Sequence, residues 1–282
     1  MSDLSPREEA ERAAREIERL ANPDPQPTAG PASLPPAGYW AVTKSATYAF
    51  WAALPLFVLY EVGIVVANGG ISGGMGQVRV GADIWIKSFL NALGLGGGLM
   101  LGVVVLALGL AVWWRERHRR PPFVPKYFGG ILVESLVYAV VLAFLVSGMV
   151  GAIFGAWVLP DLALAQMSEF GLGLQLALSI GAGLYEELVF RVLLVGGLFL
   201  GLLKFTKLDR TKAYIIAALV GAVLFSAVHH MGSFGDPFTL SVFTFRFLFG
   251  LALNAVFLLR GFAVAAWTHA IYDVLVVTGS FG

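Results

Sequence analysis

Long apolar stretches alternate with short polar ones along most of this chain. Seven stretches approach the roughly 20 residues that a helix needs to cross a bilayer, and they cover 46–68, 95–114, 128–150, 172–198, 213–231, 240–259 and 262–279. Only helices and closed barrels satisfy their backbone hydrogen bonds in lipid, and runs of this length indicate helices. The pattern therefore predicts an all-α polytopic membrane helix bundle with about seven transmembrane helices.

Two other segments have patterns of their own. The stretch "GADIWIKSFLNAL" (81–93) predicts an interfacial or re-entrant helix between the first two spans. Near the N-terminus, "SPREEAERAAREIERL" (5–20) predicts a charged, solvated helix, and the six prolines of 21–38 predict an extended linker. We therefore divide the chain into a cytoplasmic segment, 1–38, and a transmembrane domain, 39–282.

Composition supports the membrane assignment and excludes several functions. Hydrophobic residues make up 58% of the chain and charged residues only 13%, whereas soluble domains carry about 25% charged residues. The net charge is +1 and the sequence shows no clustered basic face, so a nucleic-acid partner is not expected. The chain has no cysteine, which excludes disulfides and thiolate catalysis.

The distribution of basic residues predicts an orientation. Cytoplasmic loops of membrane proteins carry an excess of lysine and arginine. One side of the predicted bundle receives 115–126, 204–212, Lys44 and Arg260, and the other receives little beyond Arg79 and Lys87. We expect a multi-pass protein of a prokaryotic cell membrane, with its N-terminus in the cytoplasm and its C-terminus outside.

Charged residues inside the apolar segments need partners. Ionised side chains are costly at membrane depth, so they pair with one another or mark functional sites. For Glu61, Glu134 and Arg246, which stand singly in their segments, we expect structural pairing rather than catalysis.

The segment "GLYEELVFRVLL" (183–194) differs because it carries three charged residues together. On a helix, Glu187 and Arg191 stand at positions i and i+4 with the acid first, the favoured order for an ion pair. Glu186 is rotated by about 100° from Glu187 and lacks this obvious partner. We therefore interpret Glu187 and Arg191 as a pair and Glu186 as a candidate general base.

Two later segments add histidines to this set. "FSAVHH" places Phe225 and His229 at i and i+4, with His230 beside them, and "HAIYD" places His269 and Asp273 at the same spacing. Three of the four histidines thus fall in apolar segments. Histidines on two helices, together with a Glu-Glu-Arg helix, favour a functional site over isolated packing residues.

In this order, the three motifs resemble those of the CPBP family of intramembrane proteases. Glu186-Glu187-Leu-Val-Phe-Arg191 matches EExxxR, Phe225-Ser-Ala-Val-His229 matches FxxxH, and His269-Ala-Ile-Tyr-Asp273 matches HxxxN/D. This family includes the CAAX prenyl endopeptidases called Rce1 and the bacterial Abi proteins. The resemblance covers about 172–279.

The resemblance implies a catalytic role for each motif. Glu186 and His229 would hold and activate a water, with Glu186 as the general base. Glu187 and Arg191 would fix the helix geometry and could contact substrate. His269, with Asp273, would stabilise the tetrahedral oxyanion. The third motif commonly ends in asparagine, and an ionised aspartate only accepts hydrogen bonds. Asp273 is therefore either protonated or orients His269.

The same residues are compatible with two mechanisms, one with a zinc ion and one without a metal. Glu186, His229 and His269 could instead bind zinc, because two histidines and a carboxylate with an open position form a known type of zinc site. The metal-free, glutamate-type mechanism is favoured, with no cofactor.

The expected partners are the lipid bilayer and a membrane-anchored protein or peptide substrate, whose peptide bond the protein would hydrolyse. Two other functions remain as alternatives. One is a proton-coupled transporter, since transporters also place acids and histidines at mid-membrane. The other is a non-enzymatic immunity or scaffold protein on the same fold.

Overall fold

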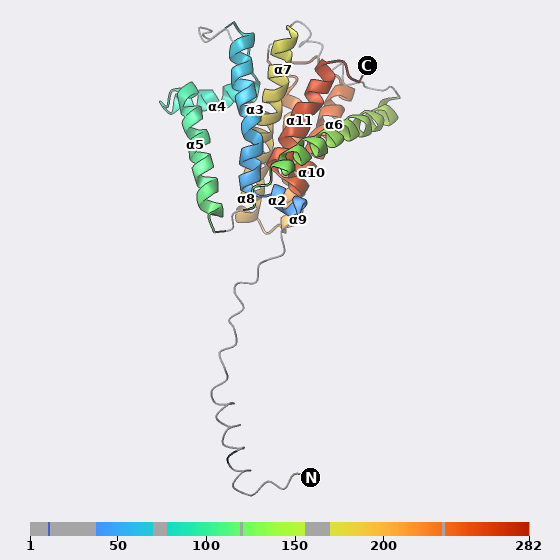
Figure 1. Ribbon diagram of the computed structural model, residues 1–282. Coiled ribbons are helices and arrows are strands. Elements are labelled where there is room, and N and C mark those ends of the chain that lie inside the picture. The colour runs from blue at the N-terminus through green and yellow to red at the C-terminus, as the bar shows by residue number, and fades with distance from the viewer. Residues whose placement is uncertain are drawn as a thin grey trace. The chain divides into compact units, whose positions relative to one another are not determined.

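A computed structural model describes residues 11, 38–69, 78–118, 121–155, 170–232 and 235–281. These residues form helices, and no strand occurs among them: α2 (Tyr39–Thr43), α3 (Ala46–Ala67), α4 (Gly81–Ala92), α5 (Gly97–Glu116), α6 (Pro125–Phe154), α7 (Leu172–Gly181), η3 (Ala182–Val195), α8 (Gly196–Phe205), α9 (Arg210–Val228), α10 (Leu240–Arg260) and α11 (Phe262–Val277). Figure 1 shows the helices gathered into one bundle. The predicted helix at 5–20 and linker at 21–38 lie outside the described residues, apart from Glu11 and Gly38.

The apolar stretches of the sequence correspond to these helices. Within the described part of the chain, five helical segments are long and apolar enough to cross a membrane: Ala46–Ala67, Pro125–Phe154, Leu172–Phe205, Arg210–Val228 and Leu240–Arg260. A shorter apolar helix, α11, has 16 residues. The prediction of an all-helical, multi-pass membrane protein is confirmed.

The helix predicted at 81–93 is present as α4, with 12 residues. At 1.5 Å per residue it is about 18 Å long, well short of a span. Figure 1 shows α4 lying across one end of the pair formed by α3 and α5. Its position relative to the membrane surface stays a prediction.

The fourth predicted span contains a departure from α-helical geometry. Residues Ala182–Val195 form a π-helix, flanked by α-helix on both sides. Its wider turn is visible at the end, where the Gly196 N–H bonds to the Arg191 carbonyl, five residues earlier. π-helical segments are rare and frequently occur at functional sites. Here the segment contains the whole EExxxR motif.

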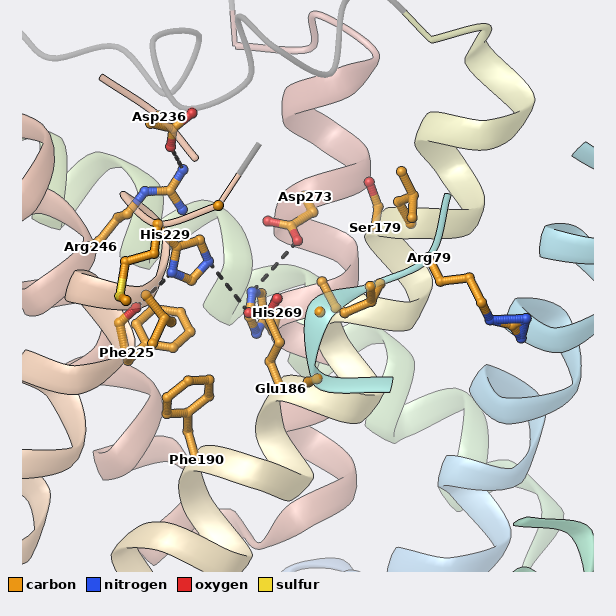
Figure 2. Close-up of a pocket in the computed structure, with 18 of the residues that line it drawn as sticks. Arg79, Ser179, Glu186, Phe190, Phe225, His229, Asp236, Arg246, His269 and Asp273 are labelled. Atoms are coloured by element: carbon orange, nitrogen blue, oxygen red, sulfur yellow. Dashed lines mark hydrogen bonds and ion pairs between the residues drawn. The ribbon is translucent and has the colours of Figure 1, made fainter. Parts of the chain in front are cut away.

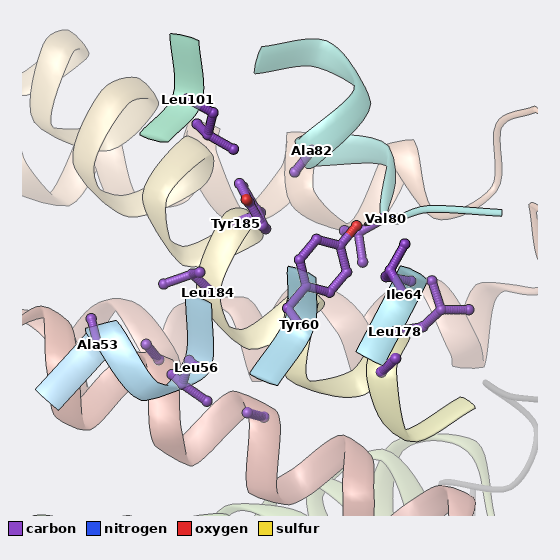
Figure 3. Packing of buried hydrophobic residues seen from close by; sticks show 13 residues of the cluster. Ala53, Leu56, Tyr60, Ile64, Val80, Ala82, Leu101, Leu178, Leu184 and Tyr185 are labelled. Atoms are coloured by element: carbon purple, nitrogen blue, oxygen red, sulfur yellow. Dashed lines mark hydrogen bonds between the residues drawn. The ribbon is translucent and has the colours of Figure 1, made fainter. Parts of the chain in front are cut away.

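Helix α11 is the central element of the bundle, because it packs against α3, α6, α7, η3 and α10. Small side chains permit this, since Ala263, Ala265 and Ala266 are almost fully buried. One hydrophobic cluster joins α3, α7 and η3 to α11, and Figure 3 shows Tyr60 and Tyr185 within it. Their rings meet edge to face with centroids 5.1 Å apart. This packing fixes η3 between α3 and α11.

A buried ion pair ties α6 to the end of α10. The guanidinium of Arg260 donates to the carboxylate of Glu134 (Nη2–Oε2, 2.9 Å) and to Thr43 Oγ1 (2.8 Å), and Tyr39 OH also donates to Glu134 (2.7 Å). The expected structural pairing of Glu134 is confirmed. Arg260, which the orientation argument counts as a loop charge, is only 4% exposed. It is a packing residue, and loop composition could not show this.

A second ion cluster ties α3 to α4. Arg79 donates to Glu61 (2.7 Å) and to Asp83 (2.7 Å), and Lys87 lies 2.9 Å from Glu61 and 2.8 Å from Asp83. Tyr185 OH also donates to Glu61 (2.8 Å). Two carboxylates thus meet two cations, and Glu61 is structurally paired as expected. The cluster reaches η3 through Tyr185, the residue before Glu186.

Candidate active site

A cavity of about 590 Å³ lies where η3, α9, α10 and α11 meet. Four of the six residues predicted for the site line it: Glu186, His229, His269 and Asp273. They come from η3, the end of α9 and α11, and Figure 2 shows them around one space. The structure therefore brings together three motifs that are up to 87 residues apart. Glu187 and Arg191 do not line this cavity.

Glu186 faces His229 across the cavity. Oε2 of Glu186 lies 3.5 Å from Nε2 of His229, and Figure 2 marks this contact. The other ring nitrogen of His229, Nδ1, lies 2.6 Å from the Phe225 carbonyl oxygen. A carbonyl only accepts, so Nδ1 carries a proton and Nε2 of the neutral ring is an acceptor. As its spacing indicates, Glu186 has no cation one turn away on its own helix, and its Oε2 makes no hydrogen bond within the described residues although it faces His229.

The FxxxH spacing now has a structural reason. Phe225 and His229 are one helical turn apart, so the carbonyl of Phe225 is within reach of the histidine ring. The Phe225 ring also meets the His229 ring edge to face, with centroids 4.7 Å apart. Phe225 therefore fixes both the rotation and the tautomer of His229.

His269 lies between two carboxylates. Its Nδ1 is 2.7 Å from Oε1 of Glu187, and its Nε2 is 3.6 Å from Oδ2 of Asp273. The first is a hydrogen bond in which Nδ1–H donates, and the second is too long for one. The supporting partner of His269 is therefore Glu187 on η3. The i, i+4 spacing of the HxxxD motif indicates only the more distant contact, to Asp273.

Glu187 also holds Arg191, as its spacing predicts. Oε1 of Glu187 lies 3.0 Å from Nη1 of Arg191, and neither residue is more than 1% exposed. The guanidinium carbon lies 4.5 Å from the centre of the Phe225 ring, and Nη2 is 3.4 Å from the Gly250 carbonyl oxygen. A buried pair of this kind is strongly destabilising to break. Arg191 and His269 thus contact the same carboxylate oxygen of Glu187.

Gly183 sets the distance between η3 and α11. A Cβ at this position would lie 2.5 Å from Ala270 Cβ and 2.6 Å from the Ala266 carbonyl oxygen. Such approaches are too close for any side chain other than hydrogen. Glu187 follows Gly183 by four residues, and His269 precedes Ala270 directly. The close approach of the two backbones therefore brings Glu187 within hydrogen-bond distance of His269.

An ion pair that the sequence did not assign to the site also lines the cavity. Arg246 of α10 and Asp236, from the segment before α10, form a close salt bridge at its edge (Figure 2). The Asp236 N–H donates to the His229 carbonyl oxygen (2.8 Å). Pairing of Arg246 was expected, but its partner lies outside the three motifs. The sequence did contain an indication of this partner, because Asp236 is an acidic residue that closely follows the second motif.

His230, noted beside His229 in the sequence, does not line the cavity. Its Nδ1 lies 3.0 Å from the Asp236 carbonyl oxygen, and its ring stacks near Phe243 at 6.1 Å. It helps to hold the segment that carries Asp236. Of the two adjacent histidines, only His229 faces Glu186.

The zinc alternative can be compared with the geometry. Zinc ligands lie about 2.0–2.2 Å from one point. Among the described residues, no group of three or more histidine, aspartate or glutamate side chains is arranged to hold a metal ion. Glu186, His229 and His269 share the cavity, but the present arrangement of these side chains does not fit a zinc site.

Fold and site together define a class: a multi-pass membrane protein whose bundle encloses paired carboxylates and histidines. Within it, residues 168–275 match the family model described as type II CAAX prenyl endopeptidase, Rce1-like. This match confirms the resemblance drawn from the three motifs, and it covers every residue of the predicted site. The matched residues are less than half of the chain, and the description of the model names an endopeptidase. Searches of curated proteins and of solved structures gave no match.

Proposed function

We propose that the protein is an intramembrane endopeptidase that hydrolyses a peptide bond of a membrane-anchored protein or peptide, using a water activated by Glu186 and His229. The observation that carries this proposal is the Glu186–His229 pair, with its 3.5 Å separation, inside the cavity that also contains His269. The family match supports the reaction class.

The pair is suited to activate water. Glu186 Oε2 and the Nε2 acceptor of His229 can each accept one hydrogen of the same water molecule, which leaves an oxygen lone pair free for attack. As that oxygen bonds to the peptide carbonyl carbon, Glu186 takes the proton, the step of a general base. When the carbon–nitrogen bond breaks, the same proton passes to the leaving amine. Atoms and protons then balance as simple hydrolysis.

His269 is placed to act on the carbonyl oxygen. Its Nδ1–H is held by Glu187, so the ring has a fixed orientation. A proton on Nε2 would then donate to the developing oxyanion. Preorganised donors of this kind typically contribute about 10²–10³ in rate. Asp273 lies 3.6 Å from Nε2. Its carboxylate would attract the Nε2 proton but is too distant to accept a hydrogen bond from it, so the proton stays available to the oxyanion.

The walls of the cavity indicate the kind of segment it accepts. Trp85, Phe190, Phe245 and Phe249 contribute apolar surface, and Figure 2 shows Glu186 close to His269 and Asp273. Apolar side chains next to the scissile bond would bury surface there. This is the expected composition of a substrate segment that enters from a membrane.

The test compares membrane-protein termini in cells that contain the protein, lack it, or contain the Glu186→Gln variant. The proposal expects new termini that occur only with the active protein. It expects the substrates to accumulate uncut in both other strains. Identical termini in all three strains would contradict proteolysis. Termini restored by the Glu186→Gln variant would reject the assigned base while keeping a protease.

A further inference from the structure

A second cavity, of about 690 Å³, lies behind η3 and is separate in its lining from the first, since the two share no residue. Its walls come from η3, α8, α9 and α10, and they are mainly apolar, including Val195, Phe199, Leu219 and Leu251. The mechanism proposed above does not use it. Its access to the lipid and the cation at its mouth indicate that it binds a ligand.

The cavity opens toward lipid along one side. Three of its lining side chains are large, apolar and exposed: Ile215 by 50%, Leu219 by 42% and Leu258 by 55%. They belong to α9 and α10, which are both long and apolar enough to span a membrane. In a bilayer, such side chains contact acyl chains. The adjoining apolar cavity is therefore accessible to an acyl chain from the surrounding lipid.

The mouth of the cavity is positively charged. Arg210, at the start of α9, lines it, and its guanidinium carbon lies 5.4 Å from the centre of the Phe199 ring. The segment 204–212 carries four cations (Lys204, Lys207, Arg210 and Lys212) against one acid, Asp209. Asp209 is engaged by Lys212, through a 3.2 Å ion pair and the N-cap hydrogen bond. The segment therefore has an excess of three positive charges, and its Arg210 lines the cavity.

Buried polar atoms face the same space. Asn254 is 3% exposed and lines the cavity, and its Oδ1 has no hydrogen-bond partner among the described residues. Tyr214, another lining residue, donates its hydroxyl to the Asn254 backbone carbonyl (2.9 Å). A buried acceptor without a donor is unfavourable. A ligand with a hydroxyl group would satisfy it.

We propose that this cavity binds an anionic phospholipid, with its phosphate near Arg210 and an acyl chain against the apolar wall. The guanidinium of Arg210, the cation of the segment 204–212 that lines the cavity, selects the phosphate, and the lipid-facing opening admits the chain. Because Arg191 and Val195 of η3 form part of the wall, an occupied cavity would support the helix that carries Glu186 and Glu187.

The experiment measures lipid binding to the full-length protein by native mass spectrometry, and thermal stability in nanodiscs. Nanodiscs of phosphatidylglycerol are compared with phosphatidylcholine nanodiscs of the same acyl chains. Arg210→Gln removes the cation at the mouth, and Lys207→Gln is the matched control, since Lys207 lies in the same segment but not in the lining. One cation near a membrane surface is worth about 1 kcal/mol. We therefore expect about fivefold weaker phosphatidylglycerol binding for Arg210→Gln only.

A second variant tests the cavity itself. Ala255→Phe would place a ring in the cavity, because Ala255 is an exposed residue of its lining. The control, Ala111→Phe, places the same ring at an exposed position of α5 outside the cavity. We expect the first to lose bound phospholipid and the second to retain it. Equal binding of both lipids to the unmodified protein would overturn the proposal, as would unchanged binding in both Arg210→Gln and Ala255→Phe. Binding of inorganic phosphate without lipid would indicate an anion site only. None of these readouts depends on proteolysis, so the outcome is independent of the proposed activity.

Discussion

Glu187 holds His269 by a 2.7 Å hydrogen bond, although the two residues are 82 positions apart. The same oxygen of Glu187 lies 3.0 Å from Arg191. Arg191, Glu187 and His269 thus form one buried line of contacts that ends at the cavity containing Glu186. The second glutamate of the EExxxR motif therefore positions the histidine of the third motif, while the first glutamate faces the cavity.

Glu186→Gln is expected to lose proteolysis while keeping the fold. Glutamine preserves size and hydrogen bonding but cannot take a proton from water. General base catalysis typically contributes about 10²–10⁴ in rate, so we expect a loss of that order in kcat on a purified substrate. Thermal stability should remain near that of the unmodified protein. Turnover at the original rate would reject Glu186 as the base.

Substitution of Glu187 is expected to reduce both stability and activity. Glu187→Ala leaves Arg191 buried without its carboxylate partner, and removing one member of a buried pair costs about 3–5 kcal/mol. It also releases His269. In a double-mutant cycle with Arg191→Met, the two losses should be strongly non-additive, with a coupling of about 0.5–3 kcal/mol in unfolding free energy. Additive losses would mean that the pair is not a unit.

Gly183→Ala tests the close packing of η3 on α11. The added methyl group would meet Ala270 and the Ala266 backbone at 2.5–2.6 Å, and overpacking costs about 1–3 kcal/mol. We expect lower stability and a lower kcat, because the Glu187–His269 distance must increase. Gly201→Ala on α8 is the matched control, since nothing lies within 4 Å of its added Cβ. A larger loss of stability in the control would contradict the prediction.

Asp273 can be compared with the asparagine that commonly ends the third motif. At 3.6 Å from His269 Nε2, a carboxylate attracts the ring proton, and an amide can itself donate to an oxyanion. We expect Asp273→Asn to retain kcat within about tenfold, and Asp273→Ala to lose up to about 10²-fold, because the oxyanion donor His269 would lose the carboxylate that attracts its Nε2 proton. An alanine variant with the original kcat would remove Asp273 from the site.

Metal dependence is tested by chelation together with elemental analysis. We expect the purified protein to cleave substrate after treatment with a chelator and to contain no stoichiometric metal. The reason is the donor arrangement, in which His269 is held by Glu187 and Glu186 faces His229. Activity that is lost on chelation and restored specifically by zinc would contradict the metal-free mechanism and favour the ligand set Glu186, His229 and His269.

The sequence alone predicted the helices, and it singled out four residues that the structure places around one cavity. Length and hydropathy are local properties of a segment, and a bilayer imposes a fixed thickness on it. The predicted stretches therefore agree closely with the helices, for example 240–259 with Leu240–Arg260. The i, i+4 spacing likewise predicted the Glu187–Arg191 pair, because that contact depends only on one helix.

Contacts between helices were decided by tertiary packing. His269 is held by Glu187 because Gly183 permits η3 and α11 to approach closely, and no periodicity within either segment contains that distance. Tertiary packing also decided three other features: the partner of Arg246, the burial of Arg260 and the π-helical turns of Ala182–Val195. A charged side chain in an apolar helix indicates that it has a partner on another part of the chain. Which residue provides it depends on how the helices are placed against one another.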